Sequence, residues 1–222
     1  MWITLQKYIL NKVRIFQIID LTLSPQTKLT IMKTITLSEN VMVSDPCYSP
    51  DTWCQTKLNN VLPGNYIVDV DYSDEGDWGN RVSGITVLHE SIQGGNLDWE
   101  DGGEVGVDSG QCGIFCMTGY RNDEIVENIT TPPLDRPFVI PFRNEGDVWY
   151  EAMCKFTLSK DQWGSYDTGV VSSSGLGDGM YPFYVVMDGD KIVGIRLEYL
   201  GNSDEEILDE DEDYLMDEEN ED

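Results

Sequence analysis

YPFYVVMDGDKIVGIRLEY, residues 181–199, consists of two apolar runs joined by Asp188-Gly189-Asp190. In the second run apolar and polar side chains alternate, which is the period of a strand with one buried face. Asp-Gly between two such runs is a strong hairpin signal, because Gly readily adopts the positive φ of a tight turn. The stretch therefore predicts an antiparallel hairpin and a β fold.

Two upstream segments show the same alternation. In the first, Tyr66, Val68, Val70 and Tyr72 alternate with more polar neighbours. The second predicts a long antiparallel strand over residues 148–158. Its two expected faces are, on the apolar side, Val148, Tyr150, Ala152, Cys154, Phe156 and Leu158, and on the polar side, Trp149, Glu151, Met153, Lys155 and Thr157.

Helix signals are few. Ser49-Pro50-Asp51 combines a capping residue, a first-turn Pro and an early acid, so it predicts a short helix through about Leu58. Residues 121–128 are a second candidate. Because 21 Gly and 9 Pro interrupt the rest at short intervals, we expect a mostly β fold, an antiparallel sandwich or partly open barrel with one or two short helices.

Charge divides the chain into three parts. The 41 acidic and 14 basic residues give a net charge of −27. Residues 203–222 hold thirteen acids and no base, which predicts a disordered acidic tail, because like charges at that density oppose compaction. Residues 32–202 form the predicted β-rich domain, with a net charge of −17. Such acidity argues against direct nucleic-acid binding, which needs clustered Lys and Arg.

Residues 1–31 form a basic N-terminal extension. Charged residues interrupt every apolar stretch long enough to span a bilayer, and no secretory signal is evident, so we expect no transmembrane segment and a cytoplasmic location. The sequence MKTITLSENVMVSDP from Met32 reads like a natural start. This predicts that residues 1–31 are not part of the native protein. The alternative is a genuine amphipathic arm that docks on a membrane or an acidic surface.

Neither cysteine nor histidine suggests catalysis. The five cysteines are an odd number without a secretory signal, so we expect them to be reduced. Cys112 and Cys116 lack the spacing and the neighbouring His of common zinc sites. His89 is the one possible base, and it precedes Cys112, opposite to the order in papain-like enzymes. The sequence therefore predicts no catalytic residue, no metal ligand and no cofactor.

Three separate segments each place an aspartate in a turn. They are SDPCY at 44–48, VDSG at 107–110 and SGLGDGMYP at 174–182. An Asp in such a setting either accepts backbone N–H groups and pins the turn, or converges with others to hold a cation or a hydroxyl-rich ligand. The candidate ligand-binding residues are Asp45, Asp108, Ser109 and Asp178. The residues alone leave both alternatives open.

The order of these segments resembles the domain-of-unknown-function family 4241 and related phage and bacterial DPCY proteins. The resemblance runs from Asp45 to Tyr199, through the segments DPCY, LPGNY, WGNRVSGITVLHE, VGVDSGQCGIF and SSSGLGDGMYPFYV. It implies a mostly β fold and brings no known activity. The residues that carry it are Asp45, Pro46, Asp108, Gly110, Gly177, Asp178, Gly179, Tyr181 and Pro182.

Two functions remain as expectations. The first is a non-catalytic acidic binding module, phage-encoded and active in the host cytoplasm, that engages a host or phage protein with a basic surface. The second is a small-ligand-dependent or metal-dependent enzyme built on an Asp-rich pocket. The oligomeric state is not predicted.

Overall fold

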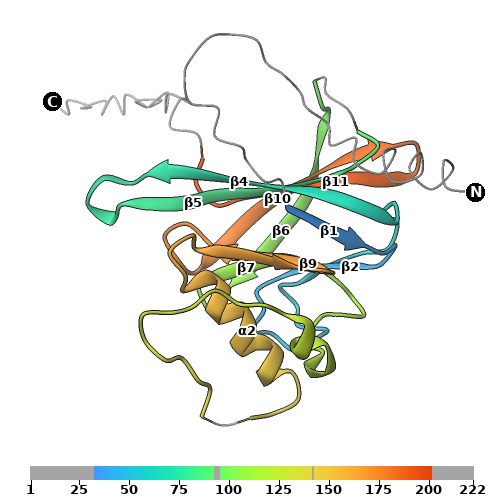
Figure 1. The fold of residues 1–222 in the computed structure, drawn as a ribbon. Coiled ribbons are helices and arrows are strands. Elements are labelled where there is room, and N and C mark those ends of the chain that lie inside the picture. Colours follow the sequence, from blue (N-terminus) through green and yellow to red (C-terminus); the bar gives the residue numbers. More distant parts are fainter. Residues whose placement is uncertain (1–32, 93–95, 142, 202–222) are drawn as a thin grey trace, which may run out of the picture. The chain divides into compact units, whose positions relative to one another are not determined.

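A computed structural model describes residues 33–92, 96–141 and 143–201. These residues form two antiparallel sheets and a small helical region (Figure 1). The predicted basic extension at 1–31 and the predicted acidic tail at 203–222 lie outside the described residues. Over the described part of the chain the sheets do not close into a barrel, so the antiparallel sandwich is the form that the β prediction takes.

The larger sheet has six strands in the order β1-β4-β5-β11-β10-β6. The predicted C-terminal hairpin is confirmed, since β10 and β11 pair antiparallel up to Asp188 and Lys191, and Gly189 has the expected positive φ of 64°. The strands are β1 (Lys33–Leu37), β4 (Gly64–Asp74), β5 (Asn80–His89), β11 (Lys191–Glu198), β10 (Gly179–Asp188) and β6 (Trp99–Val107).

The smaller sheet has five strands in the order β3-β2-β7-β9-β8. All four of its pairings are antiparallel. The strands are β3 (Thr56–Leu58), β2 (Val41–Ser44), β7 (Gln111–Cys116), β9 (Gly169–Ser173) and β8 (Trp163–Tyr166). Strand β7 is buried along its whole length.

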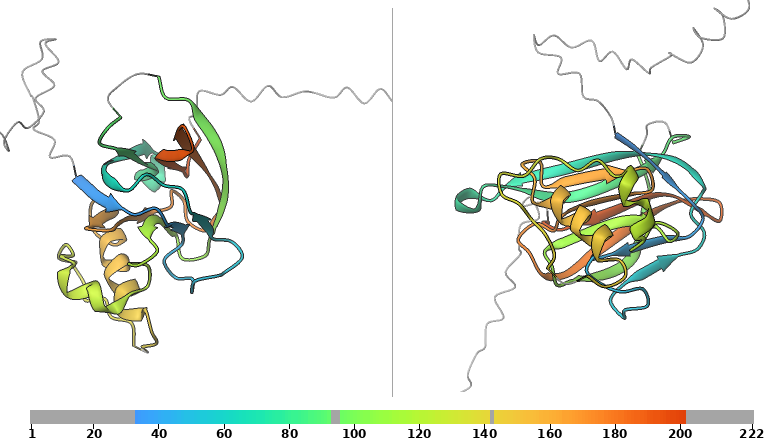
Figure 2. Two further views of the ribbon diagram at one scale, coloured as in Figure 1. Left: turned by 90° about the vertical axis from the view of Figure 1, so that its right-hand side faces the viewer. Right: turned by 60° about the horizontal axis from the view of Figure 1, so that its bottom comes forward.

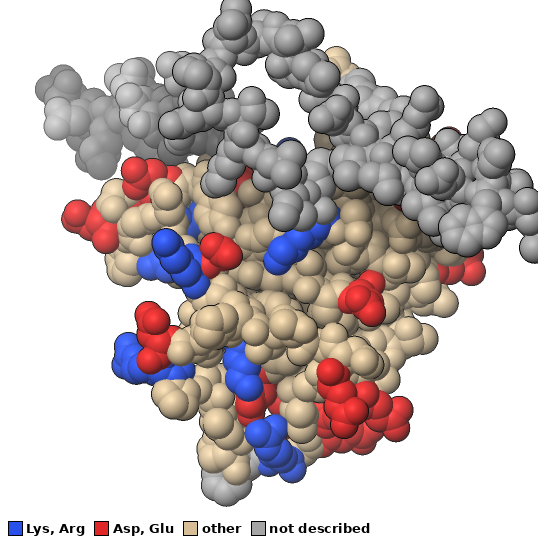
Figure 3. All heavy atoms as spheres, viewed as in Figure 1, with Lys and Arg blue, Asp and Glu red and all other residues tan. Residues whose placement is uncertain are grey.

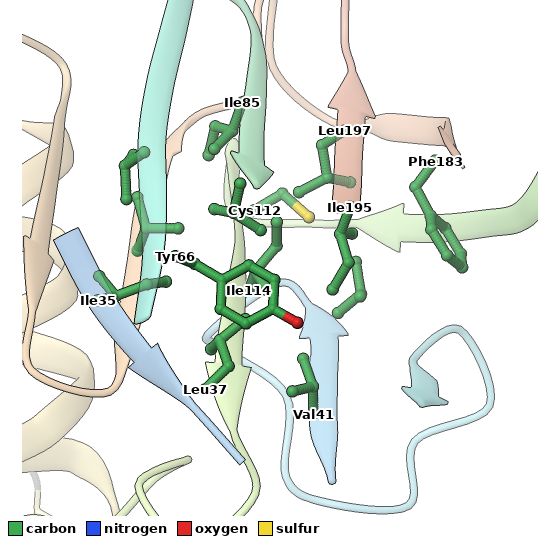
Figure 4. Close-up of a cluster of buried hydrophobic side chains, with 14 of the residues drawn as sticks. Ile35, Leu37, Val41, Tyr66, Ile85, Cys112, Ile114, Phe183, Ile195 and Leu197 are labelled. Carbon is green, nitrogen blue, oxygen red and sulfur yellow. The ribbon is translucent and has the colours of Figure 1, made fainter. Parts of the chain in front are cut away.

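The main core lies between the two sheets and draws side chains from both, including Ile35, Tyr66 and Ile114 (Figure 4). The alternation predicted for β4 is confirmed at Tyr66 and Val68, which are buried. It ends at a register shift between Asp71 and Tyr72, beyond which Tyr72 is exposed. The hydrogen-bonding capacity of the buried Tyr66 hydroxyl is satisfied, because it donates toward two backbone oxygens, 2.8 Å from Leu62 O and 3.1 Å from Ile192 O.

The strand predicted at 148–158 is wrong, because these residues form helix α2 (Asp147–Thr157). Its buried side chains Trp149, Ala152, Met153 and Phe156 recur at i, i+3, i+4 and i+7, the spacing of one helix face. They form a second core with side chains from β2, β7 and β9 on the outer face of the smaller sheet. Helix α2 lies against that sheet, on the side away from the larger sheet (Figures 1 and 2).

The short helix predicted from Ser49 to Leu58 is also wrong. The backbone here makes hydrogen bonds to neighbouring strands instead. Leu58 of β3 lies opposite Val41 of β2, and Cys54 O accepts from Gly106 N of β6 at 3.0 Å. The second candidate at 121–128 is confirmed as a 3-10 helix, η2 (Asp123–Asn128). A further short 3-10 helix, η1 (Gly76–Trp78), sits in the β4–β5 connection.

No helix within 33–92, 96–141 and 143–201 is long and apolar enough to cross a membrane.

Candidate functional site at the aspartate turns

The fold brings the three aspartate segments together. Asp45 follows β2, the Asp108-Ser109-Gly110 turn joins β6 to β7, and Asp178 immediately precedes β10. The turn at 108–110 lies in the middle, since its backbone N–H groups donate a hydrogen bond to each of the other two aspartates. The convergence of segments that are far apart in sequence is therefore real. The carboxylates of Asp45 and Asp178, however, accept hydrogen bonds from the backbone of the turn and do not face one another around a ligand site.

Asp45 is fully buried, and its carboxylate accepts four hydrogen bonds. Oδ1 accepts from Cys47 N and from Ser109 Oγ, both at 2.7 Å. Oδ2 accepts from Asp108 N at 2.9 Å and from Ser109 N at 2.7 Å. A carboxylate offers about four lone-pair sites, so none remains for a cation or a ligand. Asp45 thus pins the turn at 108–110 to the end of β2.

Asp178 pins the same turn from its other side. Its Oδ1 accepts from Gly110 N at 2.9 Å, and Gly110 O accepts from Ser174 N at 3.0 Å. Gly110 has φ 65°, a conformation that favours glycine. The Tyr181 hydroxyl, which lies 2.8 Å from Gly177 O, holds the loop that carries Asp178 against the start of β10. The loop and the turn therefore form one hydrogen-bonded corner.

Asp108 contributes its backbone N–H to the corner through the bond to Asp45, and its side chain is exposed, like that of Asp178. The Asp108 carboxylate lies beside Tyr48, where burial, Cys54 and Asp108 together raise the pKa of the Tyr48 hydroxyl. The three carboxylates therefore differ in environment, since Asp45 is buried whereas Asp108 and Asp178 are exposed. Among the residues that the structure describes, no group of three or more His, Cys, Asp and Glu side chains is placed to hold a metal ion.

A polar network that the sequence did not suggest connects this corner to α2. Gln111 Nε2 donates to Ser109 Oγ at 3.3 Å, and Gln111 Oε1 accepts from Thr157 Oγ1 at 2.9 Å. Gln111 and Thr157 are both buried. Thr157 could not be assigned to this site from sequence, because the strand reading of residues 148–158 placed it on a solvent face.

Arg121 is a second residue that the sequence did not suggest. Its guanidinium donates to Pro46 O at 3.0 Å and to Cys47 O at 3.1 Å, and it pairs with Asp147 at 3.2 Å. It therefore fastens the DPCY segment to the first turn of α2. Its own neighbourhood carries no motif, so only the tertiary fold reveals this role.

The cysteines near the corner are held as thiols. Burial, followed by the negative charge of Asp45, raises the pKa of Cys47, and burial also raises the pKa of Cys112 and Cys154. The thiolate is the nucleophilic form of cysteine, so these groups are poorly suited to nucleophilic attack at neutral pH. All five cysteines are unbridged.

His89 makes its polar contact elsewhere. It is buried at the end of β5, its Nδ1 lies 2.7 Å from Ser91 Oγ, and its ring packs edge-on against Tyr66. These contacts fit the role of a satisfied strand histidine.

A hollow of about 310 Å³ lies on the larger sheet, lined by residues that include Asp71, Ser83, Arg196 and Glu198. None of the predicted site residues lines it. The Asp-rich pocket expected by the enzyme hypothesis is therefore not this hollow.

The fold and its corner define an antiparallel β sandwich with an added helix, closed at one end by aspartate-pinned turns. Comparison with known proteins finds no match among protein families, curated proteins or solved structures. The resemblance to family 4241 therefore stays a prediction.

Proposed function

We propose that this domain is a non-catalytic binding module that engages a protein partner with a basic surface through its acidic exterior. The observation that carries the proposal is the saturation of Asp45, whose buried carboxylate accepts four hydrogen bonds from the protein itself. The Asp45 carboxylate, the most buried of the candidate site groups, thus stabilises the fold and has no free acceptor site for a substrate or a metal ion. The proposal therefore assigns binding to the exposed acidic side chains of the domain.

The charge of the domain supports this proposal. Residues 32–202 carry a net charge of −17, and charge of one sign steers oppositely charged partners and speeds their encounter. On the face seen in Figure 3, Asp and Glu side chains lie in separate groups, with Lys and Arg side chains beside several of them. That pattern fits recognition of a partner by local charge pairs.

The enzyme hypothesis requires free groups at Asp45, Asp108, Ser109 and Asp178. Ser109 Oγ donates to Asp45 at 2.7 Å, an acceptor that holds the hydroxyl hydrogen away from any substrate. The carboxylate that faces this hydroxyl is that of Asp45, whose remaining acceptor sites are taken by three backbone N–H groups. These contacts favour the binding module.

A thermal scan of the full chain separates the two functions. We expect Mg²⁺, Mn²⁺, Ca²⁺ and nucleotides at millimolar concentration to leave the unfolding midpoint unchanged. A ligand present at 100 times its Kd would stabilise the protein by about 2.7 kcal/mol and raise the midpoint visibly. A rise that Asp108→Asn or Asp178→Asn abolishes would contradict the proposal.

A pull-down tests the partner directly. Proteins retained from a cell extract by the immobilised full chain should be basic, and they should elute as the salt concentration rises to about 0.5 M, because salt screens exposed charge pairs. Retention that survives such salt would point to a different kind of interface.

A further inference from the structure

The hollow on the larger sheet lies over a glycine between two acids. Asp71 of β4 is opposite Gly84 of β5, and Gly84 is opposite Glu198 of β11. Paired residues of neighbouring strands point to the same face, and this row faces away from the main core, in or against which the adjacent residue of each strand packs. Neighbouring strands are about 4.8 Å apart, so the Cα atoms of Asp71 and Glu198 are separated by roughly 10 Å. Because Gly84 has no side chain, a gap remains between the two carboxylates.

The backbone fixes the shape of this hollow, whose volume is about 310 Å³. The register of β4 and β5 shifts next to Asp71, and Ser83 is left without an opposite residue. Such bulges are frequent next to active sites. Ser83 O accepts from Tyr199 N at 2.8 Å and from Leu200 N at 3.2 Å, which holds Leu200 at the wall of the hollow. A hollow of this size suits a small molecule.

Charges of both signs line the hollow. Arg196 lies two residues before Glu198 in β11, so both side chains are on the same face. Arg196 Nη2 donates to Glu198 Oε1 at 3.3 Å, and the Arg196 side chain is 33% exposed. This is the one side-chain hydrogen bond of Arg196 in the described part of the chain, so further N–H groups of the guanidinium remain for an anionic oxygen. Asp71 is exposed and forms no ion pair within 33–92, 96–141 and 143–201.

We infer that the hollow is a binding site for a free α-amino acid, with the ammonium group at Asp71 and the carboxylate at Arg196. Charge-assisted hydrogen bonds hold the two ends of such a zwitterion. Arg196 repels a simple cation, and Asp71 and Glu198 repel a simple anion. A neutral hydroxyl-rich molecule meets both charges without compensating either.

The lining also indicates which kind of amino acid fits. Acidic, basic and hydroxyl side chains predominate, and Leu200 is the aliphatic contribution. A short polar side chain, such as that of serine, therefore suits the gap above Gly84. The site is separate from the aspartate corner, none of whose residues lines it, and it does not depend on the protein partner proposed above.

An NMR titration of the full chain labelled with ¹⁵N tests the inference with four matched probes. L-Serine carries both charged groups, ethanolamine lacks the carboxylate, glycerate has a hydroxyl in place of the ammonium, and glycerol has neither charge. L-Serine should cause saturable shifts of the Ser83 and Gly84 amide signals, with a Kd of about 1 mM or below. Ethanolamine and glycerate should each bind about tenfold or more weakly, because each gives up one charged hydrogen bond. Glycerol should bind more weakly still.

Two variants and a matched control assign the groups. Asp71→Asn should weaken L-serine binding about tenfold and reduce the preference for L-serine over glycerate, because the ammonium loses its carboxylate. Arg196→Gln should weaken binding about tenfold and reduce the preference over ethanolamine, because the carboxylate loses its guanidinium. Asp69 is the control, since it is also exposed, lies two residues before Asp71 on the same face of β4 and does not line the hollow. Asp69→Asn should keep the Kd within about twofold of wild type.

The results separate this inference from the proposed function. No saturable shift with L-serine up to about 10 mM overturns the inference and leaves the salt-sensitive capture of basic proteins unaffected. Equal binding of the four probes overturns the recognition of both charges. No loss in Asp71→Asn, or an equal loss in Asp69→Asn, overturns the location of the site. Thermal midpoints verify that the variants are folded, and if Arg196→Gln is unfolded, the four probes on the wild type decide by themselves.

Discussion

At the scale of single residues, Asp45 shows why a buried carboxylate can be stable. An unpaired buried charge is very costly, but three backbone N–H groups and one hydroxyl surround this one. The N–H groups also need the carboxylate, because a buried donor left without an acceptor lowers the stability of the protein by about 1–3 kcal/mol. Acid and turn therefore depend on each other.

Asp178 makes one such bond and is exposed, so its replacement should cost less. Asp178→Ala should lower the free energy of unfolding by about 0.5–1.5 kcal/mol, the usual net value of one hydrogen bond. Asp108→Ala should change it by less than about 0.5 kcal/mol, because that side chain is exposed. Urea unfolding measures both. Equal losses in the two variants would mean that the corner is not held as described.

At the scale of elements, α2 is where the sequence pattern misled. Residues 148–158 satisfy a period of two and also a helix period, since Trp149, Ala152, Met153 and Phe156 fall on one helix face. The strand reading placed Trp149 and Met153 in solvent, whereas both are fully buried. Length could have decided between them, because eleven residues are long for a strand and ordinary for a helix.

Met153→Ala and Leu158→Ala distinguish the two readings. Met153 is fully buried, so its truncation should lower the free energy of unfolding by about 2–4 kcal/mol. Leu158 is 58% exposed, and its truncation should cost less than about 1 kcal/mol. The strand reading requires the opposite order. Urea unfolding of the two variants measures the difference.

Glu151 gives α2 a pH-dependent anchor. Burial alone would raise the pKa of Glu151, but hydrogen bonds from Lys155 and Ile140 N, together with Arg143, bring it below its ordinary value. A carboxyl whose pKa is lower in the folded state stabilises the protein above its unfolded pKa, about 4.3, and this stabilisation is lost as the pH falls through the folded pKa.

Wild type should therefore lose more stability than Glu151→Gln between pH 5 and pH 3. The comparison cancels the contributions of the other carboxylates, which both proteins share. Free energies of unfolding measured across that range give the result, and parallel pH profiles for the two proteins would contradict it.

At the scale of the whole molecule, sequence reasoning succeeded where signals were local. The hairpin of β10 and β11 followed from alternation and a Gly189 turn, both contained in the segment itself. Local turn-forming residues also singled out the three aspartate turns. Their partners could not be predicted, because Asp45 bonds to residues 63 and 64 positions away. The helix predicted at 49–58 failed for the same reason, since Cys54 O bonds to Gly106 in another strand.

The same long-range bonds tie the two sheets together. Asp45 directly follows β2 of the smaller sheet. Its carboxylate accepts a hydrogen bond from Asp108 N, which directly follows β6 of the larger sheet. The central claim is that this carboxylate serves the fold and binds no ligand. This claim predicts that loss of the Asp45 charge lowers the free energy of unfolding of the whole domain.

Urea unfolding of Asp45→Asn beside Asp108→Asn tests this claim most directly. An amide at position 45 must turn an NH₂ group toward backbone N–H donors, so Asp45→Asn should lower the free energy of unfolding by about 2–4 kcal/mol. Asp108→Asn should stay within about 0.5 kcal/mol of wild type. An Asp45→Asn protein as stable as wild type, or more stable, would contradict the account. Removing the charge of a carboxylate that is kept for a ligand leaves the stability of the ligand-free protein unchanged or raises it.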